Sequence, residues 1–134
     1  MKRWQIWLLV FAVILAALPA VFAQSSSTVV PKYDKASEAV FKGTIIEIHD
    51  RQCPVSGGIG SHIVVKLSDG STTEVHLSST KFVKQYELVF KPGDAVEITG
   101  VKVTFQDTDA IFARKIKRGT DEFLFRDNDG KPLW

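Results

Sequence analysis

Hydrophobic and polar residues alternate along most of the chain after residue 38, which is the pattern of β-strands with one buried face. The alternation predicts five strands, over residues 38–50, 62–67, 72–77, 95–105 and 110–117. Residues 78–90 differ, because their apolar side chains recur at i, i+1, i+4, i+7 and i+8, which predicts a helix. Ser78, Ser79 or Thr80 would cap the start of this helix by accepting a backbone N–H.

Short polar segments predict the connections between these elements. The sequence SDGS at 68–71 is typical of a tight hairpin turn. The glycine-rich stretch RQCPVSGGIGS at 51–61 predicts an irregular loop, and DNDG at 127–130 predicts a last hairpin between 122–126 and 131–134. The predicted order is therefore three strands, a helix, two strands and a terminal hairpin.

This order is the topology of an OB-fold. We predict a mainly β protein, with a five-stranded OB-fold-like barrel, one helix between strands three and four, and a C-terminal β-hairpin. Gly43 and Gly100 lie within the first and fourth strands, where such a barrel needs sharp bends. An SH3-like barrel is the nearest alternative, but it does not account for the helical stretch at 78–90.

The N-terminus has the pattern of an export signal. Lys2 and Arg3 precede an apolar run over 6–18, and Val21-Phe22-Ala23 resembles a cleavage site. The domain organisation predicted is a signal peptide over 1–23, a flexible tether over 24–37 and an OB-like domain over 38–134. The protein is then periplasmic or secreted, and it contacts the membrane only if the N-terminal segment stays uncleaved.

Charge argues against nucleic-acid binding. The chain has 17 Lys and Arg against 15 Asp and Glu. Because Lys2 and Arg3 leave with the signal, bases and acids are equal in number in the mature chain. A protein that follows phosphate backbones usually carries a basic excess.

Two histidines flank the SDGS turn. A three-residue loop that ends on Gly70 sets His62 opposite His76, with Cβ atoms about 4.5–5.5 Å apart on one face. Both rings could then reach one metal ion. Glu74 and Lys66 share this face, which we expect to be the wetter one. These four residues, His62, His76, Glu74 and Lys66, are the candidate ligand-binding residues.

A metal hypothesis adds two further side chains, His49 and Cys53, which precede His62 in sequence. A mixed histidine and cysteine set formed by His49, Cys53, His62 and His76 suits zinc or copper. The spacing matches no known metal motif, and the lack of a CxxCH sequence excludes covalently attached haem. A simpler interpretation is favoured, in which the histidines are exposed beside Glu74 and Cys53 is buried and inert. Under this interpretation we expect no resident cofactor.

The remaining motifs indicate no calcium, catalytic or phosphate-binding site. RDNDG at 126–130 lacks the glutamate of a calcium loop, so Arg126 and Trp134 are expected to pin the terminal hairpin to the domain. Ser56 lies outside a Gly-x-Ser-x-Gly elbow, and no phosphate-binding loop is present. The basic stretch at 113–119 is interpreted as a charged edge strand. We therefore expect a protein that is not an enzyme.

Several segments resemble a family of small exported bacterial domains. They are GTIIEI, GSHIVVKLSDGSTTEVHL, KPGDAVEITGVKV, AIFARKIKRG and LFRDNDGKPLW, which together span most of 41–134. The chain is similar, more loosely, to a domain of the magnetosome-associated MamS/MamX-type proteins. The resemblance implies an OB-like fold and export, and it supplies no activity. Family members usually have Gly-Pro after Val-His-Leu, where this chain has Ser78 and Ser79.

Three functions follow in order of preference. The first is an exported, non-enzymatic binding module of the bacterial cell envelope, which recognises a small ligand or an envelope protein. The second is a metal-binding or redox accessory protein that uses the cross-strand pair His62 and His76. The third, a nucleic-acid-binding OB domain, is disfavoured by export and by the charge balance.

Overall fold

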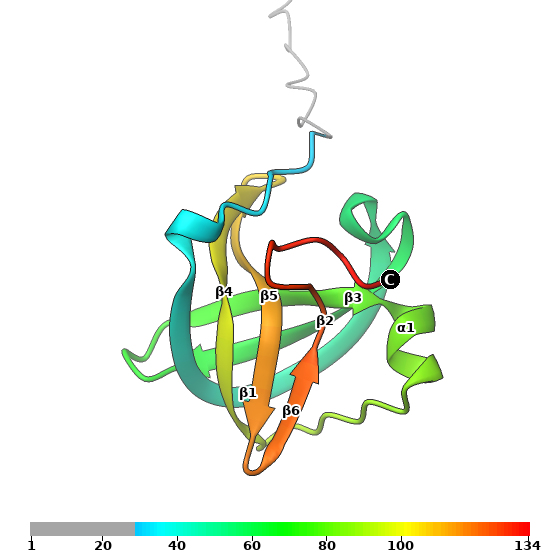
Figure 1. Ribbon diagram of the computed structural model, residues 1–134. Helices are drawn as coiled ribbons and strands as arrows, with labels where there is room; N and C mark the ends of the chain where they lie inside the picture. The colour runs from blue at the N-terminus through cyan, green and yellow to red at the C-terminus, as the bar shows by residue number, and fades with distance from the viewer. Residues whose placement is uncertain (1–28) are drawn as a thin grey trace, which may run out of the picture.

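The protein forms a curved β-sheet with one short helix, in a computed structural model that describes residues 29–134 (Figure 1). The predicted signal peptide at 1–23 lies outside the described residues. The strands are β1 (Ala39–Cys53), β2 (Gly58–Leu67), β3 (Thr72–Ser79), β4 (Ala95–Phe105), β5 (Thr108–Arg118) and β6 (Asp121–Leu124). The helix α1 is Thr80–Gln85, and two 3-10 turns are η1 (Lys35–Ser37) and η2 (Pro54–Ser56).

The sheet has the strand order β3-β2-β1-β4-β5-β6, and its neighbouring strands are antiparallel. One further pairing, between β3 and β5, is parallel. Strand β1 is long and curved, and it pairs with β2 and with β4. The prediction of a mainly β protein with a helix between the third and fourth strands is confirmed.

Two glycines allow strands to approach closely where the sheet bends. A Cβ on Gly43 would collide with the carbonyl oxygen of Lys66, and a Cβ on Gly100 would collide with that of Phe112. The register of β4 against β5 shifts at Gly100, as expected for a bend. In β1 the shift lies slightly later, between Ile45 and Glu47.

The hydrophobic core lies inside the curve of the sheet. Its fully buried members come from β1 to β5 and from the segment after β6, and they include Ile45, Ile63, Val65, Val75, Ile98, Ile111, Ile116 and Phe125. Phe82 of α1 and Phe90 of the following coil pack against or within this cluster. The alternation that predicted the strands therefore identifies the inward-facing side chains.

The β2–β3 hairpin has the predicted register. His62 pairs with His76, and Ile63 pairs with Val75. Gly70 has a φ of 86°, the left-handed conformation that the three-residue loop requires.

The predicted loop at 51–61 is wrong. Strand β1 continues to Cys53 and pairs with Gly58 at the start of β2, so most of this stretch is a β-hairpin. The turn is η2 followed by Gly57, whose φ is 69°. Backbone pairing holds these residues, although their side chains do not alternate between apolar and polar.

The helix is shorter than the predicted 78–90. The Ser79 hydroxyl accepts a hydrogen bond from the Phe82 N–H at 3.2 Å, which caps α1 at its start. The helix ends at Gln85, and Glu87 has a φ of 52°, outside the helical region. The apolar residues beyond this point reach the core or the surface from coil.

The predicted terminal hairpin is also different. Strand β6 pairs with β5, and the last residues make a single bridge, between Arg126 and Pro132. The expectation of an edge strand at 113–119 is wrong too, since β5 pairs with β3, β4 and β6.

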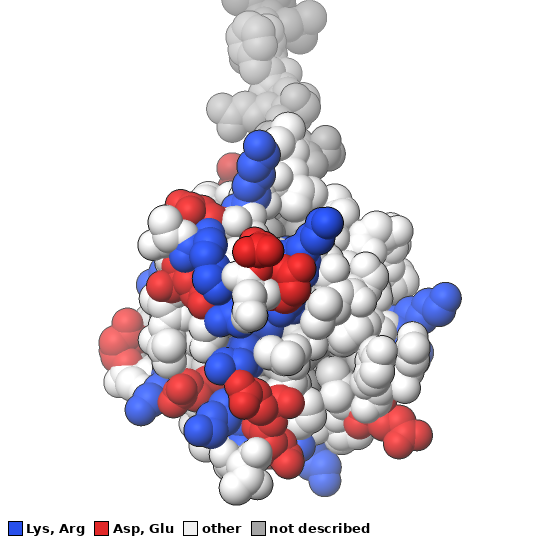
Figure 2. All heavy atoms as spheres, viewed as in Figure 1, with Lys and Arg blue, Asp and Glu red and all other residues white. Residues whose placement is uncertain are grey.

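Three of the four basic residues of β5 are paired with acids. The ion pairs are Arg114 with Glu38, Lys115 with Glu122 and Arg118 with Asp94. Figure 2 shows acidic and basic side chains interleaved across this face, consistent with this local pairing.

Contacts with the domain begin within the predicted tether. The Tyr33 hydroxyl donates a hydrogen bond to Glu38 at 2.6 Å, and the Tyr33 ring lies 5.1 Å from the Arg126 guanidinium. Residues 29–134 contain no helix that is both long and apolar enough to cross a membrane.

Candidate metal centre

Three histidines lie side by side across β1, β2 and β3. His49 pairs with His62, and His62 pairs with His76. The ring centroids of the first pair are 5.7 Å apart and those of the second pair 5.0 Å apart. The structure therefore brings together every histidine of the chain. We call these three residues the histidine row, and the candidate site is built around it.

The inner two histidines are buried, which corrects the expectation of an exposed face. His62 is 1% exposed and His76 is 3% exposed. The rings of Phe112 and Trp134 each lie 5.7 Å from the His76 ring. The C-terminal residues that follow β6 thus cover the side of β3 that the alternation predicts to be wet.

Burial keeps both imidazoles neutral. Desolvation lowers the pKa of His62 to about 4, and the nearby Glu74 carboxylate opposes this shift only in part. Desolvation, with the neighbouring His62 and Arg126, lowers the pKa of His76 to about 3. A neutral imidazole is the form that binds a metal ion.

A first group of donors consists of Cys53, His62 and His76, which we call the inner triad. All three residues are buried, and their ligand atoms lie within 4.8 Å of one another. Cys53 reaches this position because β1 continues through the segment predicted to be a loop. A thiol with two imidazoles is a donor set that suits copper or zinc.

The inner triad contains unsatisfied nitrogen atoms. Among the described residues, the Nδ1 atoms of His62 and His76 are buried without a hydrogen-bond partner. The other nitrogen of His76, Nε2, lies 2.8 Å from the Ser56 hydroxyl oxygen, within hydrogen-bond distance. Buried polar atoms without partners in the protein are rare, and they mark a strained position, a functional position, or one that a water molecule or an ion satisfies.

A second group, which we call the outer triad, consists of His49, His62 and Glu74. The Glu74 Oε1 atom lies 3.6 Å from His49 Nε2 and 3.9 Å from His62 Nε2. The same oxygen accepts hydrogen bonds from Arg51, at 3.0 Å from Nε and 2.7 Å from Nη2. His62 belongs to both triads.

The model of the MamS/MamX magnetosome protein family matches residues 37–123. The chain belongs to this family. The comparison with curated proteins gives no match.

Both triads lie within the residues that match the MamS/MamX family. The match ends inside β6, so Arg126 and Trp134 lie beyond it. The Arg126 guanidinium lies 5.0 Å from the Trp134 ring and 5.5 Å from the Phe112 ring. In this family member, these cation–π contacts fix the residues that cover His76, in keeping with the predicted pinning role of Arg126 and Trp134.

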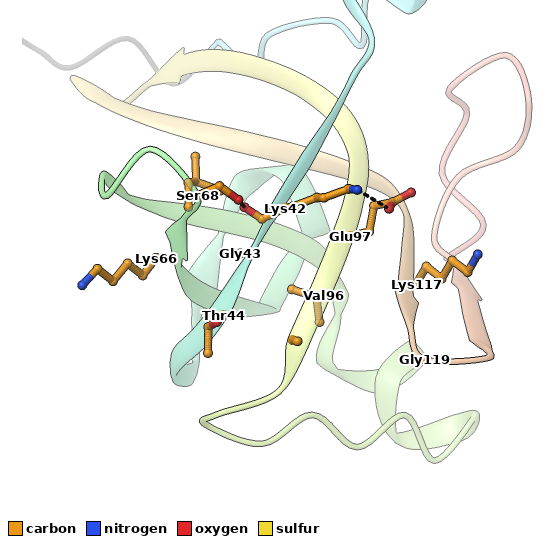
Figure 3. Close-up of a pocket in the computed structure, with 11 residues that line it drawn as sticks. Lys42, Gly43, Thr44, Lys66, Ser68, Val96, Glu97, Lys117 and Gly119 are labelled. Carbon is orange, nitrogen blue, oxygen red and sulfur yellow. Dashed lines mark hydrogen bonds and ion pairs between the residues drawn. The ribbon is translucent and has the colours of Figure 1, made fainter.

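Lys66 is not part of the histidine row in this MamS/MamX protein. It borders a separate cavity of about 520 Å³, which Lys42 and Lys117 also border. In Figure 3 the Lys66 and Lys117 side chains point away from each other, while Lys42 pairs with Glu97 at 3.8 Å. The three amines do not converge on a common point, so they form no anion site.

Two contributors to the site escape sequence reasoning, Ser56 and Arg51. Ser56 reaches His76 only because η2 folds back over the hairpin, and the sequence between Cys53 and Gly57 gives no sign of it. Arg51 and Glu74 are of opposite charge, but their pairing depends on the β1–β2 register. Because the sequence predicts a loop at 51–61, it assigns Arg51 no place in that register.

Proposed function

We propose that this MamS/MamX family member is a metal-binding module, not an enzyme, and that it holds Zn²⁺ or Cu⁺ between Cys53, His62 and His76. The observation that carries the proposal is the inner triad itself, with three buried donors within 4.8 Å and two ring nitrogens without partners. We infer further that the curved sheet is an OB-like barrel, closed by the parallel pairing of β3 with β5. We also propose that the protein works in the periplasm or after secretion.

The distances support an ion at the inner triad. Zinc binds sulfur at about 2.3 Å and imidazole nitrogen at about 2.0–2.1 Å, so ligand atoms around a tetrahedral ion lie about 3.4–3.6 Å apart. The three donors lie within 4.8 Å of one another. Changes of about 1 Å, within reach of small side-chain rotations, bring them to bonding distance.

A purely structural role explains the triad less well. Each buried ring nitrogen without a partner costs about 1–3 kcal/mol, and the inner triad holds two of them. Apolar residues would fill the same space without that cost. A metal ion would satisfy a nitrogen of each ring, and it would also account for a lone buried cysteine beside them.

The other two functions stay predictions with less support. Recognition of a small ligand or an envelope protein has no described feature that selects a ligand. The interleaved charges seen in Figure 2 give that face no basic patch for nucleic acid.

Titration of the purified, metal-free protein with Co²⁺, Zn²⁺ and Cu⁺ tests the proposal. We expect stoichiometric binding and, with Co²⁺, a thiolate-to-cobalt charge-transfer band. Cys53→Ser, which preserves the size of the side chain, should abolish the band and weaken binding at least tenfold. The double variant His62→Ala, His76→Ala should bind no ion at this position.

A matched control is Ser61→Ala, which changes another buried polar residue of β2 outside the donor set. It should bind metal as the wild type does. Circular dichroism confirms that each variant is folded. Wild-type protein that gives no charge-transfer band under any loading condition would refute the proposed function.

A further inference from the structure

We propose that the outer triad, His49, His62 and Glu74, is a second metal site that captures the ion from solution and passes it inward through His62. This inference rests on the proposed function, since it supplies the route to the inner triad. It assigns a separate role to His49 and Glu74, which do not belong to the inner triad.

The outer triad has distances that suit an ion. Its two measured separations, 3.6 Å from Glu74 Oε1 to His49 Nε2 and 3.9 Å to His62 Nε2, are close to the spacing of ligands around one metal. For bonds of about 2.1 Å, tetrahedral or trigonal angles place ligand atoms about 3.4–3.6 Å apart. Shifts of a few tenths of an ångström therefore suffice to form the site.

Accessibility decreases from the outer triad to the inner one. The side chain of His49 is 30% exposed and that of Glu74 is 19% exposed. Cys53 and His76 are buried. An ion from solution can therefore reach His49 and Glu74 first, and His62, whose side chain is 2% exposed, lies behind them on the way inward.

His62 is the link between the two triads. Its Nε2 atom lies on the side of Glu74, at 3.9 Å, and its Nδ1 atom is buried without a hydrogen-bond partner. An imidazole ring offers two distinct nitrogens, so a single side chain can present a donor to each triad.

The donor types favour inward transfer of thiophilic ions. The outer triad has a carboxylate and two imidazoles, whereas the inner triad replaces the carboxylate with the Cys53 sulfur. Soft thiolate ligands prefer Cu⁺ and Zn²⁺, and carboxylates suit harder ions. The inner triad is therefore the final position, and the outer triad the place of capture.

Arg51 competes with the ion for Glu74. Its guanidinium makes two hydrogen bonds to Oε1, the oxygen that faces both histidines. The Arg51 side chain is 40% exposed, so it can turn into water when a cation arrives. Removal of this guanidinium should leave Glu74 free and speed the capture.

Stopped-flow mixing of the full-length, metal-free protein with Co²⁺ separates the two steps. The growth of the thiolate charge-transfer band reports arrival at Cys53. We expect His49→Ala and Glu74→Gln to slow this phase about tenfold or more, because they remove the attraction and the donors at the surface. The final amplitude should stay as in the wild type.

Arg51→Met should speed the same phase. Lys117→Met is the matched control, since it makes the same change of charge on β5, which carries no residue of either triad, and should leave the rate almost unchanged. Unchanged rates in His49→Ala and Glu74→Gln would overturn the proposal. So would a faster rate in Trp134→Ala alone, because that variant opens the cavity of about 410 Å³ that Ser56 and Trp134 border.

The failure of the proposed function has a different signature. In that case the wild type itself shows no thiolate band. Failure of the capture step leaves the band at full amplitude and changes none of the rates in the two outer-triad variants.

Discussion

Acid should destabilise the metal-free protein through its two buried histidines. Both rings are neutral in the folded protein, because burial lowers the pKa of His62 to about 4 and that of His76 to about 3. In the unfolded chain each titrates near 6.5. Between these values the unfolded state binds more protons, so the free energy of unfolding falls as the pH falls. The stability that neutral burial supports is complete only above pH 6.5.

The size of the effect follows from the same shifts. Between pH 7 and pH 5, each histidine takes up a proton on unfolding and remains neutral when folded, which lowers the free energy of unfolding by about 2 kcal/mol. The two together give about 4 kcal/mol, a large part of the roughly 5–15 kcal/mol of a typical domain. With a urea m-value of about 1–3 kcal/mol per molar, the midpoint falls by about 2 M.

Urea unfolding at pH 7, 6 and 5, with a chelator present, measures this decline. Carboxylates change the free energy of unfolding mainly below pH 4.5, so they hardly affect its decline between pH 7 and pH 5. The double variant His62→Gln, His76→Gln should lose most of the pH dependence. The matched control is His49→Gln, which alters the histidine of the row whose side chain is 30% exposed and leaves the contribution of the buried pair in place. A wild type whose midpoint is the same at pH 7 and pH 5, or a double variant that declines as steeply, would refute the reasoning.

Two further predictions concern the fold. Gly100→Ala places a Cβ against the Phe112 carbonyl oxygen and should cost about 2–3 kcal/mol in thermal or urea unfolding, whereas Gly58→Ala, with no atom within 4 Å of the new Cβ, should be nearly neutral. Equal effects of the two substitutions would contradict this. Glu38→Gln removes the carboxylate charge and one of the two oxygens that accept 2.8 Å hydrogen bonds from Arg114, which hold the pKa of Glu38 near 2, and it should cost about 2 kcal/mol at pH 7. That stability is lost as the pH falls from 4.5 to 2, so a difference from wild type that persists at pH 2 would count against the ion pair.

Local sequence was enough to predict half of the candidate site. The Asp-Gly turn fixes the loop length, and the alternation on either side excludes a register that sets core residues against solvent. Together these place His62 opposite His76, as the structure has them. Both signals lie within a stretch of seventeen residues, 61–77.

The burial of that pair could not be predicted, because it depends on residues distant in the chain. Trp134 and Phe112 lie far from His76 in sequence and reach it through the β3–β5 pairing and the C-terminal segment. Alternation identifies two faces of a strand, but it does not show whether a later segment covers the outer one.

The positions of His49 and Cys53 depend on the β1–β2 hairpin. The glycines at 57–60 are typical of a loop, so the sequence does not predict this hairpin. Backbone hydrogen bonds extend both strands there without an apolar pattern. The hairpin sets His49 beside His62 and brings the Cys53 sulfur within 4.8 Å of a ring nitrogen of both inner histidines. A prediction based on hydrophobic periodicity has no access to this pairing.

The histidine row conflicts with the fold around it, and that conflict is the strongest argument for a function. Most of the other buried side chains of the sheet are Ile, Val, Leu and Phe, and its buried polar residues beside the two histidines are the small Ser61 and Ser78. At this one place the chain buries two imidazoles, leaves a nitrogen of each without a partner, and gives up stability in acid. Sequences that break local rules of packing do so mainly at functional sites. The metal ion that we propose would resolve the conflict, because it would satisfy the nitrogens, use the neutral form that burial enforces, and give the lone Cys53 a role.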